Sequence, residues 1–143
     1  MKYFLVLPAL TVFLLATSGC GTIDTLSPYN LRVEIRPSRV EYAQTDSFTG
    51  SFRFANRTAR NIRAEFGSSQ LFDLAFYDSL GAESFHYNMG AYQRVTYLDL
   101  GPLGTHTVNL AFPFYGLPRG TYRVHAWVER HEDIYSDVSI QVR

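Results

Sequence analysis

The chain has 143 residues, and its 13 Lys and Arg side chains balance its 13 Asp and Glu side chains. A chain so close to neutrality does not have the electrostatic footprint of a nucleic-acid-binding protein. Its single cysteine excludes a disulfide within the chain, so the fold must be stabilised by burial of apolar surface, to which an aromatic content of 15% contributes large areas.

The first twenty residues have the pattern of an export signal. Lys2 is the only charged side chain among them, and residues 3–16 form a largely apolar run that ends in small residues before Cys20. A membrane-spanning helix needs about 20 apolar residues, so this run is too short to span a bilayer and fits the apolar region of a signal peptide. An ordinary secretory signal and an uncleaved apolar helix are the alternatives.

The same segment resembles the bacterial lipoprotein signal, in which a short box of small and aliphatic residues ends in a cysteine. The matching residues are Leu14, Leu15, Ala16, Ser18, Gly19 and Cys20. Thr17 stands where that family usually has Leu. The resemblance implies cleavage between Gly19 and Cys20, a diacylglyceryl group on the Cys20 sulfur, and acylation of the new amino terminus, for example by palmitate. One acyl chain binds a membrane reversibly, whereas two or more hold a protein stably.

These features divide the chain into a signal peptide at 1–19, a lipidated Cys20 with a short tether through residue 30, and one domain at 31–143. The tether at 21–30 spans at most about 33–36 Å, so the domain is expected to lie close to its membrane. Gly21 follows the cysteine, which in the lipoprotein family permits sorting to the outer membrane where the host has one. We therefore expect a location in the cell envelope, facing the periplasm or the outside.

From Leu31 onward, apolar residues alternate with polar ones, which is the period of β-strands. The alternating runs predict strands at 31–36, 48–54, 62–66, 72–77, 82–87, 105–112, 122–128 and 134–142. Residues 88–97 are less regular and are expected to form a loop or an edge segment. About seven to nine short strands, separated by turn sequences, predict an all-β fold, an antiparallel β-sandwich of immunoglobulin-like architecture.

The order of short motifs between residues 52 and 128 resembles the intracellular proteinase inhibitor family BsuPI. The matching residues are Phe52, Phe54, Asn56, Phe66, Ser69, Gln70, Phe72, Asp73, Asp78, Gly81, Tyr92, Gln93, Leu100, Gly101, Pro102, Gly104, Gly120, Thr121 and Tyr122. Phe85 and Tyr87 stand where the family commonly has Trp. The resemblance implies a β-sandwich and the inhibition of a proteinase, although the export signal contrasts with the intracellular location of the family.

The segment PFYGLPRG at 113–120 is the candidate for binding a partner. An inhibitor that mimics a substrate needs a stiff exposed loop, and two prolines stiffen this one. The side chains that would enter a proteinase pocket are Phe114, Tyr115, Leu117 and Arg119. The alternative is a strand connection whose aromatic side chains fold back over the end of the sandwich.

No pattern in the sequence indicates catalysis, a metal or a cofactor. The chain has no nucleophile elbow, phosphate-binding loop or dinucleotide fingerprint. The histidines fall on separate predicted strands or corners, without the spacing of metal ligands; they are His86, His106, His125 and His131. Four arginines surround one predicted turn, where a solvated hairpin is expected and an anionic partner is the alternative; they are Arg53, Arg57, Arg60 and Arg63.

Together these observations predict a membrane-anchored lipoprotein without enzyme activity, whose β-sandwich binds another protein. One hypothesis is the inhibition of an envelope or extracellular proteinase. The other is a structural or assembly module of the cell envelope, which holds a partner protein through a sheet face or an edge strand.

Overall fold

The alternation of apolar and polar residues becomes a set of strands in the computed structural model, which describes residues 30–87, 93–113 and 116–143. The described residues form ten strands and no helix: β1 Leu31–Pro37, β2 Glu41–Tyr42, β3 Ser47–Asn56, β4 Ile62–Phe66, β5 Phe72–Tyr77, β6 Glu83–Tyr87, β7 Thr96–Leu100, β8 Thr105–Pro113, β9 Gly120–Val128 and β10 His131–Val142. None of the described residues belongs to a helix of the length and apolar character that crossing a bilayer would take.

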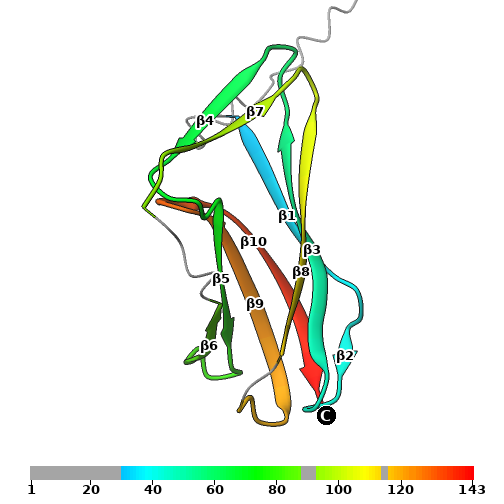
Figure 1. Ribbon diagram of the computed structural model, residues 1–143. Coiled ribbons are helices and arrows are strands. Elements are labelled where there is room, and N and C mark those ends of the chain that lie inside the picture. Colours follow the sequence, from blue (N-terminus) through cyan, green and yellow to red (C-terminus); the bar gives the residue numbers. More distant parts are fainter. Residues whose placement is uncertain (1–29, 88–92, 114–115) are drawn as a thin grey trace, which may run out of the picture.

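The strands form two larger sheets that face each other. One sheet has the order β1-β3-β8 and the other has the order β2-β10-β9-β5-β6. A separate pair, β4 and β7, lies at the end of the sandwich where β1 begins (Figure 1). All pairings are antiparallel except that of β2 with β10, which is parallel. The predicted immunoglobulin-like β-sandwich is confirmed.

Aromatic side chains from the two sheets fill the space between them. Phe52 of β3 stacks on Phe72 of β5 with ring centroids 4.5 Å apart, and Phe48 meets Phe76 edge-on at 5.5 Å. All four side chains are at most 1% exposed. Offset and edge-on aromatic pairs of this kind contribute beyond the area that they bury, so the phenylalanines stabilise the sandwich without a disulfide.

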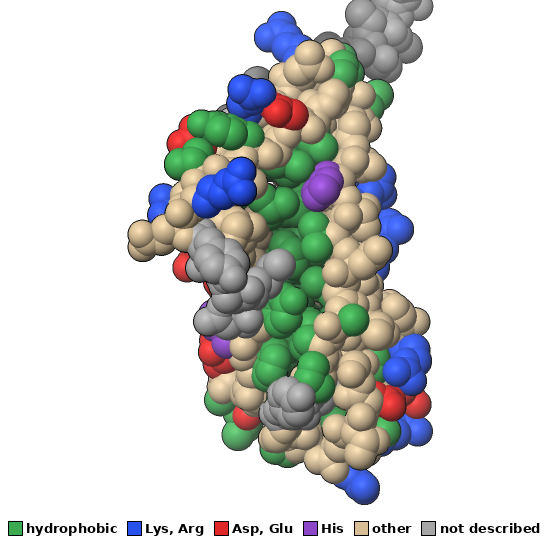
Figure 2. Space-filling model, in the orientation of Figure 1, with side chains coloured by type: hydrophobic (Ala, Val, Ile, Leu, Met, Phe, Trp, Pro, Cys, Tyr) green, Lys and Arg blue, Asp and Glu red, His purple; other side chains and the backbone are tan. Residues whose placement is uncertain are grey.

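The two sides of the sandwich differ. On one side the Ile35 amide of β1 donates to the Ser136 hydroxyl of β10 at 3.1 Å, and the Tyr42 hydroxyl of β2 donates to the Thr49 carbonyl of β3 at 2.8 Å. These bonds join the two sheets. On the other side the sheets end in β8 and β6, and Figure 2 shows a strip of apolar side chains between them.

One buried polar side chain, Asn56 at the end of β3, organises the end of the sandwich beside β4 and β7. It is 3% exposed, and its amide group donates to the carbonyls of Arg60 and Gly101, both at 2.7 Å. Its side-chain oxygen accepts from the amide and the hydroxyl of Thr58, both at 2.8 Å. Asn56 thereby joins the turn after β3 to the loop between β7 and β8.

The structure corrects the strand prediction in three places. β7 occupies part of the expected loop or edge segment and extends beyond it, and β10 begins at His131 rather than at 134. β2 was not predicted, because two residues are too short to show a period. With these additions the described strands number ten rather than seven to nine, and the β2–β10 pair departs from a purely antiparallel arrangement.

Candidate functional site

The outer face of the five-stranded sheet gathers polar and aromatic side chains from four strands. In β9 the residues of one phase are buried in the core, while those of the other phase point outward, as the two-residue period of a strand requires. The same holds for β5. We call the outward set the histidine face: Asp73, Tyr77, Glu83, His86, Arg123, His125, Trp127, Tyr135 and Asp137.

The strand register centres this face on a small residue. Ala75 of β5 is the register partner of His86 on β6 and also of His125 on β9. Trp127, the only tryptophan of the chain, is the partner of Asp73 on one side and of Tyr135 on the other. The two histidines are therefore held on either side of Ala75, one row away from the tryptophan.

The indole of Trp127 contacts both imidazoles. Its ring centroid lies 5.8 Å from that of His86 and 5.1 Å from that of His125. His125 also packs on Tyr135, with a centroid distance of 5.0 Å. Ala75 is 0% exposed although it lies on the outer phase of its strand, so the rings cover it. The result is an aromatic layer on the outside of the sheet.

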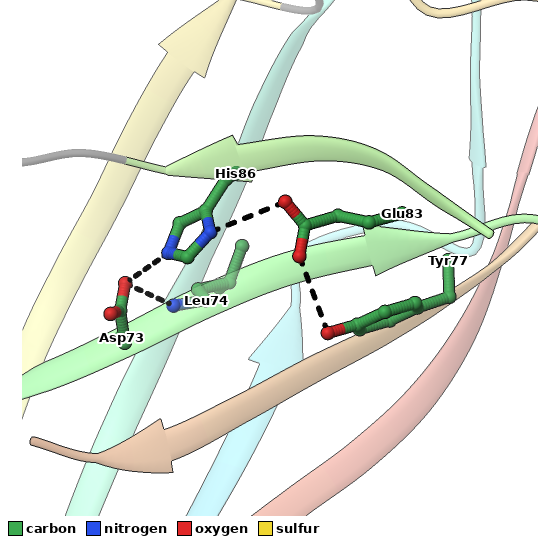
Figure 3. Close-up of polar contacts among 5 residues, drawn as sticks. All are labelled: Asp73, Leu74, Tyr77, Glu83 and His86. Carbon is green, nitrogen blue, oxygen red and sulfur yellow. Dashed lines mark hydrogen bonds and ion pairs between the residues drawn. The ribbon is translucent and has the colours of Figure 1, made fainter. Parts of the chain in front are cut away.

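His86 is clamped between two carboxylates (Figure 3). Its Nε2 lies 2.8 Å from Oδ1 of Asp73 and its Nδ1 lies 3.3 Å from Oε1 of Glu83. Burial works to lower the pKa of His86, but the hydrogen bond and charge of Asp73, together with Glu83, outweigh it and raise this pKa above the ordinary 6.5. An imidazolium donates from both nitrogens, so the arrangement suits a charged His86.

The other side chains of the face are also held in place. Tyr77 donates to Oε2 of Glu83 at 3.4 Å, and the Arg123 guanidinium lies 5.0 Å from the centroid of the Tyr77 ring. Nδ1 of His125 lies 2.6 Å from Oδ1 of Asp137. Burial and the charge of Glu83 raise the pKa of Tyr77, which keeps its hydroxyl protonated at neutral pH. Side chains fixed in this way lose little conformational entropy when a partner binds.

Two arrangements that would indicate nucleophilic catalysis or a metal site are not seen among the described residues of the face. Within the described ranges, neither His86 nor His125 hydrogen-bonds a Ser, Thr or Cys side chain, as activation of a nucleophile would require. Both nitrogens of His86 are already engaged by carboxylates. No set of three or more His, Cys, Asp or Glu in the described part of the chain is placed to hold a metal ion.

The loop at 113–120 does not present its four candidate side chains together. Leu117 is 2% exposed and packs in the core, while Arg119 is exposed and donates from Nε to the side-chain oxygen of Gln44 at 3.4 Å. The Pro118 carbonyl accepts from the Tyr122 hydroxyl at 2.8 Å, which holds this end of the loop against β9. Phe114 and Tyr115 lie outside the described residues, as do Gly19 and Cys20.

The other sequence candidates are not among the residues that define the histidine face. His106 is exposed on β8 and packs against Phe54 at 6.2 Å, while His131 is the first residue of β10. Arg63 on β4 pairs with Asp99 on β7 through its Nε at 2.6 Å. The structure brings His86 and His125 together around Trp127. Sequence reasoning missed this pair, although His125 and Trp127 do share the outward phase of their predicted strand.

Comparison with known proteins bears on the fold only. Neither a scan against protein-family models nor a search of curated proteins finds a match, so the BsuPI resemblance stays a prediction. Among solved structures, the CARDB domain of PF1109 from Pyrococcus furiosus is 16% identical with a TM-score of 0.50, covering 84% of this chain and 97% of that one.

Two larger enzymes contain a part similar to this chain. The DNA glycosylase AlkC of Pseudomonas fluorescens is 10% identical with a TM-score of 0.52, over 82% of this chain and 31% of that one. A β-glucosidase of Erythrobacter marinus is 12% identical with a TM-score of 0.53, over 80% of this chain and 16% of that one. At such identities the likeness shows the β-sandwich alone. The chain spans about a third and a sixth of these two proteins.

Proposed function

We propose that this chain is a lipid-anchored, non-enzymatic module of the cell envelope that holds a protein partner on the histidine face. The anchor is proposed from the sequence at 14–20, where an apolar run and small residues lead to a single cysteine. The sandwich begins at β1, directly after the tether, so the anchor would keep the domain and its partner near the membrane.

The composition of the face carries the proposal. Trp, Tyr and Arg are the residues most enriched among those that dominate protein–protein binding energy. The face carries the only tryptophan of the chain on the same sheet surface as Tyr77, Arg123 and Tyr135, and Tyr135 is 53% exposed. These side chains lie outside the core, so stabilisation of the sandwich does not by itself explain their accumulation on one sheet.

Of the two sequence hypotheses, the geometry supports the assembly module better than the proteinase inhibitor. A loop that enters a proteinase pocket must expose its side chains, yet Leu117 lies in the core. The histidine face, in contrast, is a broad sheet surface with prearranged side chains, as recognition by a sheet face requires.

A site-specific crosslink in the native host tests the proposal. A photo-crosslinking amino acid at Tyr135, 53% exposed on the histidine face, is compared with the same amino acid at Tyr97, 51% exposed on β7. We expect a discrete protein adduct from position 135 that is absent from position 97. After reconstitution with the identified partner, Trp127→Ala should weaken binding roughly 30-fold, as expected for a residue contributing about 2 kcal/mol.

Two outcomes would contradict the proposal. Identical adducts from both positions, or undiminished binding by Trp127→Ala, would remove the histidine face as the interface. Saturable inhibition of a serine proteinase by the mature chain would instead favour the inhibitor hypothesis, especially if changes at 114–119 abolished it.

A further inference from the structure

The outer face of the other sheet, β1-β3-β8, carries a hollow of about 430 Å³ whose lining is rich in arginine. We call it the arginine basin and define it by six of its lining residues: Arg32, Glu34, Arg36, Arg53, Arg57 and Thr105. It lies on the opposite outer face of the sandwich from the histidine face. In Figure 2, Lys and Arg side chains project along the margin beside β3 and β8.

The strand register explains the basin. Arg32, Glu34 and Arg36 occupy the outward phase of β1, between the buried residues of its inner phase. Arg53 on the neighbouring strand β3 is the register partner of Glu34. Arg57 follows the end of β3. The pairing of β1 with β3 thus brings Arg32 and Arg36 to the same surface as Arg53 and Arg57, which come later in the chain.

The basin has an excess of positive charge in a chain that is neutral overall. Four arginines and one glutamate give a local charge of +3 (4 − 1). Glu34 pairs with Arg36 at 2.8 Å, whereas no described carboxylate lies within 4.0 Å of the guanidinium nitrogens of Arg32, Arg53 or Arg57. The hydrogen bond from Arg36, aided by the nearby charges of Arg32 and Arg53, lowers the pKa of Glu34. Glu34 therefore stays ionised and neutralises only one arginine.

We propose that the arginine basin binds a phosphate-bearing anion, and that in the cell this anion is the headgroup of an acidic membrane lipid. Guanidinium groups are planar forks of donors that match the oxygens of a phosphate, and they bind it bidentately. The hollow has the size of a small-ligand site. Thr105, which also lines the hollow, adds a hydroxyl donor.

The position of the tether favours a membrane lipid as the source of the phosphate group that the basin binds. Arg32 is the second residue of β1, and the Arg57 amide donates to the carbonyl of Asn30 at 3.3 Å. The basin therefore lies where the tether joins the domain. Anionic lipid attracts basic side chains within a few ångströms of the surface. This second step rests on the proposed lipid anchor, while binding of phosphate by the basin does not.

Lipid binding by the basin would also orient the domain. The outer faces of the two sheets point in opposite directions, so a basin held against the membrane turns the histidine face away from it, toward a partner. The two surfaces would then act together without sharing a residue.

The test uses the mature chain from residue 20 with Cys20→Ser, which cannot be acylated at sulfur. Its sedimentation is measured with vesicles of phosphatidylcholine alone and of phosphatidylcholine with phosphatidylglycerol. We expect binding only when phosphatidylglycerol is present. Each arginine near an anionic surface contributes roughly a fivefold factor, so Arg32→Gln with Arg53→Gln should lower the partition about 25-fold.

A charge-matched control separates the basin from the net charge of the protein. Arg94→Gln with Arg143→Gln removes the same charge outside the basin and should change the partition less than twofold. An equal loss in both double variants, or equal binding to vesicles without phosphatidylglycerol, would overturn the proposal. Thermal denaturation of each variant shows that it remains folded.

A measurement with a soluble phosphate compound distinguishes the two sources of the anion, which are a lipid headgroup and a free phosphate. Inorganic pyrophosphate should raise the melting temperature of the same unacylated chain, and the Arg32→Gln, Arg53→Gln variant should lose this shift. Pyrophosphate binding without vesicle binding would support the phosphate site and overturn the lipid source. Because these chains carry no lipid, a failure of the proposed Cys20 anchor in the host would leave both measurements unchanged.

Discussion

His86 and Asp73 meet diagonally across the β5–β6 pair, with Nε2 of the imidazole 2.8 Å from Oδ1 of the carboxylate. Their side chains are 42% and 25% exposed, so solvent screens the ion pair. Its effect is on the protonation of the histidine. The charge of Asp73, with that of Glu83, holds the pKa of His86 above 6.5 against the opposing effect of burial.

Stability should therefore depend on pH through His86. A group whose folded-state pKa lies above its unfolded value stabilises the fold fully below the unfolded value, here 6.5, and loses this contribution as pH rises through the folded value. Asp73→Asn keeps an acceptor for the Leu74 amide but removes the charge. We expect the variant to lower the pKa of His86 in an NMR titration and to flatten the decline of melting temperature above pH 6.5. An unchanged titration of His86 would contradict this.

Asn56 is predicted to be the most sensitive polar residue of the described fold. Asn56→Ala removes the shared donor of the Arg60 and Gly101 carbonyls, which belongs to a side chain only 3% exposed, and should lower the free energy of unfolding by about 1–3 kcal/mol. Asn56→Asp keeps the shape but turns a donor into an acceptor, and it should be at least as destabilising. Urea denaturation measures both. The exposed neighbour Asn61→Ala, expected to change stability by about 0.5 kcal/mol or less, is the control.

Long alternating runs were predictable from the sequence because the two-residue period depends only on near neighbours. β1, β3 and β9 follow from such runs. β7 did not, although Leu98 and Leu100 alternate as buried residues. Its five residues adjoin an irregular segment, and its partner β4 lies about thirty residues earlier in the chain. Local spacing carries no information about such a partner.

The candidate site depended even more on long-range register. The sequence alone places His125 and Trp127 on the outward phase of one strand. It does not show that His86 joins them, because this requires knowing that β5 lies between β6 and β9. Leu117 shows the opposite limit. It lies between Gly116 and Pro118 in a loop, where no alternation applies, and yet it packs in the core. The composition of the loop therefore predicted an exposed binding side chain at Leu117, where the structure has a buried one.

Phe76 is predicted to contribute most to the core on the side of the sandwich where the sheets end in β8 and β6. Its ring meets those of Phe48, Phe85 and Phe112 edge-on, at 5.5, 5.4 and 6.1 Å. Phe76→Ala should lower the free energy of unfolding by about 3–5 kcal/mol, since the cavity cannot close without moving strands from both sheets. Leu80→Ala, at a side chain that is 92% exposed, should change it by about 0.5 kcal/mol or less. Similar midpoints in urea for the two variants would argue against this packing.

Gly50 is required by the close approach of β1 to β3. A Cβ at this position would lie 2.6 Å from the Arg36 carbonyl oxygen and 3.0 Å from Cα of Pro37, both backbone atoms. Gly50→Ala must therefore displace β1, and we expect a loss of about 1–3 kcal/mol in the free energy of unfolding. At Gly120 the nearest atom would be 3.6 Å away, an ordinary contact. Gly120→Ala should be neutral or slightly stabilising. If Gly120→Ala instead lowered the free energy of unfolding more than Gly50→Ala, β1 could be displaced at little cost.

The lipid anchor is tested by the mass and location of the protein in its native host. If Cys20 carries a diacylglyceryl group, the intact mass should correspond to residues 20–143 plus acyl chains, and the protein should remain in the membrane fraction at high salt. Cys20→Ser removes the attachment point, so the variant should lack the acyl mass. Once any leader that stays uncleaved has been removed, the variant should also leave the membrane fraction. Thr17→Leu restores the residue usual in lipoprotein signals and should be processed at least as fully. A wild-type protein that retains residues 1–19, or that is released with a free thiol, would show that two acyl chains do not hold it at the bilayer.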